Sequence, residues 1–71
     1  MAQIELLNRL IDEKGIKRSF IAKKLGITPQ GLYKKLNGSS NFRGGEMRLM
    51  GRILDLDDHQ MVEIFLPDEL K

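Results

Sequence analysis

The segment Gly26-Ile27-Thr28-Pro29 constrains the fold of this chain more than any other part of its sequence. Glycine adopts positive φ without strain, so Gly26 is suited to end one helix. The hydroxyl of Thr28 can cap a following helix, and Pro29 fits its first position, where a missing N–H removes no hydrogen bond. The sequence therefore predicts two short helices joined by a tight turn, with Ile27 directed into the core.

Apolar residues at helical spacing predict five short helices over the chain, and nowhere do apolar and polar residues alternate as in a β-strand. The expected helices lie at residues 3–14, 17 or 18 to 25 and 28–36, then between Phe42 and Leu54 and between Asp57 and Pro67. Asp57 and Gln60 have the spacing of a capping box for the last helix. The fold class is therefore all-α, a single compact five-helix domain over residues 1–71 with a flexible tail at residues 67–71.

The length of the chain and its lack of cysteine limit the classes of function. A chain of 71 residues forms one domain with one small core, which leaves little room for a deep catalytic cleft. It has no disulfide and no thiolate metal site, and its single histidine, His59, has no second histidine or cysteine to complete a metal site. No apolar run is long enough for a signal peptide or a membrane span. We therefore expect a cytoplasmic protein with no catalytic residues, no small-molecule substrate, no metal, no cofactor and no membrane contact.

The basic residues are concentrated in the middle of the chain. Residues 14–52 carry ten lysines and arginines against one acidic residue, Glu46, which gives a net charge of +9. Residues 1–13 have a net charge of −2 and residues 53–71 a net charge of −5. A cationic middle is expected of a chain that binds nucleic-acid phosphates, and an ordinary helical domain with a solvated, lysine-rich face is the alternative.

The turn and its flanking residues resemble a known family. A similar pattern occurs in the helix-turn-helix of the lambda-repressor-like superfamily of phage Cro and repressor proteins, and it is carried here by Ile21-Ala22, Leu25-Gly26-Ile27-Thr28, Leu32, Leu36 and Asn37-Gly38. The later stretch FRGGEMRLMGRILDLDDHQMVEIF resembles small Cro-like regulators of prophages in Gram-positive bacteria. The resemblance implies a helix-turn-helix at about residues 17–37, whose second helix enters the major groove of DNA.

Three residues at or near the start of the third helix are candidates for direct readout of DNA bases. Gln30 lies at its exposed start, where the amide either pairs with adenine or is merely solvated. Lys34 lies one turn further along the same face and can reach a guanine or a phosphate. Pro29 stands where many relatives have a polar base reader, and it offers only apolar contact, for instance to a thymine methyl.

A second group of residues is expected to contact the DNA backbone, which positions a protein without reading sequence. Lys17 and Arg18 stand where the family often has a small polar residue and a glutamine, so both add positive charge near the backbone. Thr28 either caps the helix alone or also touches a phosphate, and Tyr33 either packs on the backbone or covers the flank of the domain. The full group is Lys17, Arg18, Thr28, Tyr33, Lys35, Asn37, Ser39, Ser40 and Arg43.

Dimerisation is expected because one small recognition surface rarely gives tight specific binding. Domains of this kind act as two-fold dimers on half-sites about one helical turn apart, so we expect a homodimer on a pseudo-palindromic operator in double-stranded DNA. The C-terminal third offers apolar residues for the contact, and its net negative charge keeps that end away from DNA. The candidates are Leu54, Leu56, Phe65 and Leu66, of which Leu54 and Phe65 fit the domain's own core equally well.

These observations favour a non-enzymatic, sequence-specific DNA-binding regulator of transcription, a Cro-like phage or prophage repressor. The alternative is a protein-interaction module of the same fold, such as an antirepressor or an antitoxin-like partner. The basic middle segment favours the first hypothesis, because a module freed from DNA has no reason to keep acidic residues off that surface. An enzyme is not indicated, since the sequence shows no nucleophile and base pair, metal cluster or phosphate-binding loop.

Overall fold

The computed structural model describes residues 2–70, which form helices and contain no strand. The α-helices are α1 (Ile4–Lys14), α2 (Arg18–Leu25), α3 (Pro29–Leu36), α4 (Gly44–Ile53) and α5 (Asp58–Phe65), and a short 3-10 helix, η1 (Pro67–Leu70), follows them. The predicted all-α class is confirmed, and the five helices lie where the sequence placed them. Over the described residues, no helix is long and apolar enough to cross a membrane.

The helix ends are formed by the residues that were expected to form them. Gly26 has a φ of 71° and ends α2 in the left-handed conformation. Thr28 Oγ1 accepts a hydrogen bond of 3.0 Å from a backbone N–H in the first turn of α3, and Pro29 is the first residue of that helix. The capping box of α5 is also present, because the Asp57 carboxylate accepts from the Gln60 N–H at 2.7 Å and the Gln60 side chain accepts from the Asp57 N–H at 3.0 Å.

Two residues of the predicted dimer surface, Leu54 and Phe65, are buried in the core. Leu54 has no exposed area and Phe65 is 5% exposed, because α5 packs against α1 and α4 and Phe65 meets the Phe42 ring edge to face at 5.6 Å between centroids. These two residues therefore belong to the core, and only Leu56 and Leu66 of the four candidates remain partly accessible. Among the described residues, the buried hydrophobic side chains are Leu7, Ile11, Ile21, Ala22, Leu32, Leu36, Phe42, Met50, Leu54, Ile64 and Phe65.

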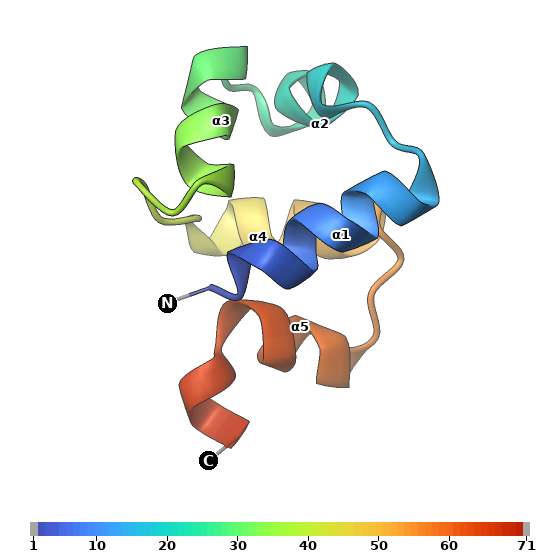
Figure 1. Ribbon diagram of the computed structural model, residues 1–71, viewed down its shortest axis with the longest axis vertical. Coiled ribbons are helices and arrows are strands. Elements are labelled where there is room, and N and C mark those ends of the chain that lie inside the picture. The colour runs from blue at the N-terminus through green and yellow to red at the C-terminus, as the bar shows by residue number, and fades with distance from the viewer. Residues whose placement is uncertain (1, 71) are drawn as a thin grey trace.

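The helices are arranged along one axis of the molecule. Helices α2 and α3 form one end, α5 and η1 form the other, and α1 and α4 cross the middle (Figure 1). The molecule extends 33 Å along its longest axis. Most of the basic middle segment therefore lies toward one end, and the acidic residues of α5 lie at the other.

The C-terminal residues Pro67–Leu70 form η1, which lies against α5. The predicted flexibility of residues 67–71 stays a prediction. Residue 71 lies outside the described residues.

Candidate nucleic-acid interface

Helix α3 presents a polar face to solvent. Leu32 and Leu36 hold its inner side in the core. Four exposed residues at positions i, i+3, i+4 and i+7 line the outer side, and we call them the recognition stripe: Gln30, Tyr33, Lys34 and Asn37. The structure thus brings two predicted base readers onto one face with two members of the predicted backbone group.

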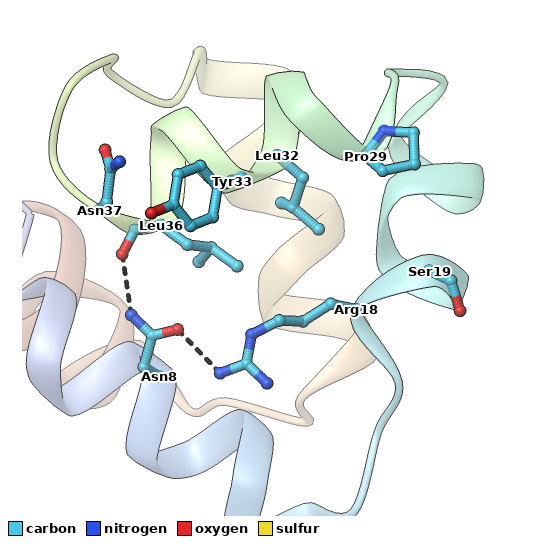
Figure 2. A pocket seen from close by; sticks show the side chains of 8 residues that line it. All are labelled: Asn8, Arg18, Ser19, Pro29, Leu32, Tyr33, Leu36 and Asn37. Carbon is cyan, nitrogen blue, oxygen red and sulfur yellow. Dashed lines mark hydrogen bonds between the residues drawn. The ribbon is translucent and has the colours of Figure 1, made fainter.

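An apolar groove runs beside the recognition stripe. It encloses about 330 Å³ and is lined by residues of α1, of the start of α2, of α3 and by Asn37 (Figure 2). Leu32 and Leu36 line it together with four residues that the sequence predicted as DNA contacts: Arg18, Pro29, Tyr33 and Asn37. The start of α2 and both ends of α3 therefore border the same hollow.

Arg18, the first residue of α2, is held by two side chains of α1. Its Nη1 donates to Asp12 Oδ1 at 2.8 Å and its Nη2 donates to Asn8 Oδ1 at 2.8 Å. The Arg18 side chain is 42% exposed and lines the groove. The predicted phosphate contact is therefore accessible, but it already has a carboxylate partner that the sequence did not indicate.

Asn8 is a residue of this site that the sequence analysis missed. Asn8 accepts from Arg18 and donates through Nδ2 to the Leu36 carbonyl at 2.9 Å (Figure 2). Its Nδ2 also donates to a carbonyl of its own helix at 3.0 Å. The Leu36 carbonyl lies in the last turn of α3, where helix carbonyls lack a partner within the helix. Asn8 thus links the middle of α1 to the end of α3 and the start of α2. One signal was available, because Asn8 occupies the i+4 position of an apolar stripe otherwise formed by Ile4, Leu7 and Ile11.

Replacing Asn8 by alanine is expected to lower the free energy of unfolding by about 1–3 kcal/mol, because the Leu36 carbonyl and the Arg18 guanidinium each lose a partner. Urea denaturation followed by circular dichroism measures the change. Asn8→Asp is the matched variant, since it keeps the size and the acceptor for Arg18, loses the Nδ2 donor, and places a carboxylate oxygen against the Leu36 carbonyl. We expect it to be destabilised as well, and full stability in both variants would contradict the assigned role.

Lys35, one of the predicted backbone contacts, is already bonded within the protein. Its Nζ lies 3.0 Å from Glu46 Oε1 and donates to the Asn41 carbonyl at 2.9 Å, and its side chain is only 11% exposed. Glu46 also accepts the Arg43 N–H at 2.7 Å at the start of α4. Lys35 therefore links α3 to the start of α4 and to the segment that connects the two helices. A phosphate contact would require both of these bonds to break, so the DNA interface that we propose does not include Lys35.

The Glu46 carboxyl gives the stability of the fold a dependence on pH. Burial raises its pKa, but the Arg43 N–H, the hydrogen bond from Lys35 and the positive charges of both residues outweigh burial and hold the pKa below its ordinary value of 4.5. Because the pKa is lower in the folded state than in the unfolded state, this stabilisation is complete above the unfolded pKa and is lost as the pH falls through the folded pKa.

Glu46→Gln is therefore expected to be less stable than the wild type by about 1–2 kcal/mol at neutral pH. The difference should begin to shrink as the pH falls below 4.5, the ordinary pKa of the carboxyl, and should vanish below the lower pKa of the folded state, where the carboxyl of the folded wild type is also neutral. Urea denaturation of both proteins at pH 7 and pH 3 measures the two differences. A difference that does not change with pH would contradict the charged role of Glu46.

The other predicted backbone contacts lie before α2, at the start of α3 and in the connection to α4. Lys17 precedes α2 and Arg43 precedes α4, and both are exposed. Ser39 and Ser40 are exposed, and their N–H groups donate to a carbonyl in the last turn of α3 at 2.9 and 3.1 Å. Thr28 is engaged as the cap of α3. A contact between DNA and any of these residues stays a prediction.

No metal site forms within the described part of the chain. His59 is exposed in the first turn of α5. No group of three or more histidine, cysteine, aspartate or glutamate side chains among the described residues could hold a metal ion.

Two short helices joined by a tight turn, the second with an exposed polar stripe, define a helix-turn-helix DNA-binding domain. Residues 1–39, which contain α1, α2 and α3, match the family described as the helix-turn-helix domain of resolvase, and the chain belongs to this family. The match does not single out the lambda-repressor-like superfamily that the sequence resembles. Comparisons with curated proteins and with solved structures gave no match.

Proposed function

We propose that this protein is a sequence-specific regulator of transcription, of the Cro-like type found in phages and prophages, that represses by occupying an operator. The observation that carries the proposal is the recognition stripe. Gln30 and Lys34, side chains suited to reading base edges, are exposed on it, away from the core. Two other members of the stripe, Tyr33 and Asn37, line the groove together with Arg18. The single acidic residue of the basic middle segment, Glu46, is paired with Lys35 and adds little net repulsion.

In the proposed complex, α3 enters the major groove of the operator. Gln30 pairs with an adenine, Lys34 reaches a guanine, and Pro29 contacts a thymine methyl. The apolar groove lies against the sugars of one strand while side chains around it bind phosphates. The phosphate contacts come from Lys17, Arg18, Thr28, Tyr33, Asn37, Ser39, Ser40 and Arg43.

The proposed protein works as a cytoplasmic homodimer on a pseudo-palindromic operator. Two copies place their recognition helices in major grooves about 34 Å apart, one turn of the duplex. Leu56 and Leu66 are the members of the predicted dimer surface that the core leaves accessible, and Leu66 is 51% exposed. We therefore assign the contact between copies to these two residues.

The test is a titration of the labelled protein with a random 20-base-pair duplex, followed by amide NMR and by fluorescence anisotropy at two salt concentrations. We expect shifts at residues 17–18 and 28–43. The three cations among the proposed phosphate contacts (Lys17, Arg18 and Arg43) give each protomer a slope of log affinity against log salt of about −2.7, or a loss of roughly 40-fold between 50 and 200 mM salt. If residues 17–43 stay unperturbed while residues 54–66 respond to added proteins, the fold serves as an interaction module.

A further inference from the structure

The ion pair between Asp12 and Arg18 lies at the proposed phosphate-binding edge of the molecule. Arg18 lines the groove beside the recognition stripe, and its Nη1 donates to Asp12 Oδ1 at 2.8 Å. Both side chains reach solvent, with 67% of Asp12 and 42% of Arg18 exposed. The Asp12 carboxylate is therefore bonded to the Arg18 guanidinium at a place where an approaching DNA phosphate can compete for the same N–H group.

Carboxylate and phosphate oxygens bind the same N–H groups of a guanidinium. An exposed ion pair is weak, because water screens the charges and both side chains lose freedom on pairing. The pair of Asp12 with Arg18 is therefore weak enough to exchange for a bond to DNA. The second contact of Arg18, from Nη2 to Asn8 Oδ1 at 2.8 Å, is to a neutral group and need not break in this exchange.

We propose that Asp12 is a built-in competitor of the DNA phosphate at Arg18 and thereby lowers the affinity of the interface for DNA. The inference rests on the proposed function, because it requires Arg18 to contact the backbone. In the free protein, Asp12 holds Nη1. On binding, a phosphate oxygen replaces the Asp12 carboxylate at Nη1, while Asn8 keeps Nη2 and the guanidinium stays at the edge of the groove.

The neighbouring residue gives a matched control for this proposal. Asp12→Asn and Glu13→Gln each remove one negative charge from the last turns of α1, but only Asp12 is bonded to Arg18. Fluorescence anisotropy with the random 20-base-pair duplex at 100 mM salt compares the wild type, both single variants, Arg18→Ala and the double variant Asp12→Asn/Arg18→Ala. Circular dichroism confirms that each variant is folded.

We expect Asp12→Asn to bind the duplex about two- to fivefold more tightly than Glu13→Gln, which is the range expected from the strength of an exposed ion pair. In the Arg18→Ala background, Asp12→Asn should lose this advantage, because no guanidinium remains for which to compete. A double-mutant cycle therefore separates competition at Arg18 from simple repulsion between Asp12 and DNA.

Three results would overturn the proposal. Equal binding by Asp12→Asn and Glu13→Gln, or weaker binding by Asp12→Asn, would show that Asp12 does not compete with DNA. A gain that persists in the Arg18→Ala background would assign the effect to repulsion. In all three cases salt-dependent binding by the wild type would leave the proposed function intact, whereas absence of that binding would overturn the proposed function and this inference together.

Discussion

Replacing Phe65 by alanine is expected to lower the free energy of unfolding by about 3–5 kcal/mol, the usual effect of emptying a buried aromatic site. Phe65 is 5% exposed and its ring packs against Phe42. A domain of this size has a total stability of about 4–11 kcal/mol, so this loss is a large fraction of it and the variant should unfold at a much lower temperature than the wild type. Thermal denaturation followed by circular dichroism measures the change.

Leu66→Ala is the matched control, because Leu66 follows Phe65 directly but is 51% exposed. It should change the stability by no more than about 0.5 kcal/mol at low protein concentration. The concentration dependence of the loss also shows whether Phe65 stabilises the core of one protomer or a contact between two copies. If Phe65 stabilised a dimer, the loss would depend on protein concentration, whereas loss from the core is the same at every concentration.

Replacing Gln30 by alanine is expected to weaken binding to a selected operator about 5- to 150-fold, the discrimination of one bidentate contact to a base. Binding to random DNA should change little, because phosphate contacts supply it. The measurement needs an operator, selected from random DNA by the wild-type protein, and anisotropy with both duplexes.

Lys17→Gln is the control for Gln30→Ala, because it should affect operator and random DNA equally. Lys17 belongs to the proposed phosphate contacts, so its loss should weaken binding to operator and random DNA alike and make the salt slope less steep by about 1. If Gln30→Ala also weakened both equally, Gln30 would be a backbone contact and base readout would belong elsewhere on the recognition stripe.

The elements of the fold could be predicted because their signals are local. Gly26, Thr28 and Pro29 act within four residues of one another, and Asp57 and Gln60 cap α5 through bonds to each other's backbone. Such interactions depend on sequence spacing and require no knowledge of how helices pack. The recognition stripe follows for the same reason, since burial of Leu32 and Leu36 fixes which side of α3 faces water.

The contacts between elements could not be predicted in this way. Asn8 reaches a carbonyl 28 residues away, and Arg18 reaches a side chain ten residues away, so both depend on the angles between helices. Lys35 was predicted to contact the DNA backbone, and only the position of α4 brings Glu46 to it. Residues at the border of a small core are equally ambiguous, which is why Leu54 fitted either a core or a dimer surface before the packing was known.

The separation of basic and acidic ends along the 33 Å axis makes the free protein an electric dipole. The field of a DNA duplex exerts a torque on such a dipole, and this torque turns the α2 and α3 end toward the phosphates while pushing the α5 end away. Because the axis is several times longer than the roughly 8 Å screening length of physiological salt, the near end responds to the field and the far end scarcely does. Collisions should therefore begin with α3 already facing the duplex, which shortens the rotational search that precedes binding.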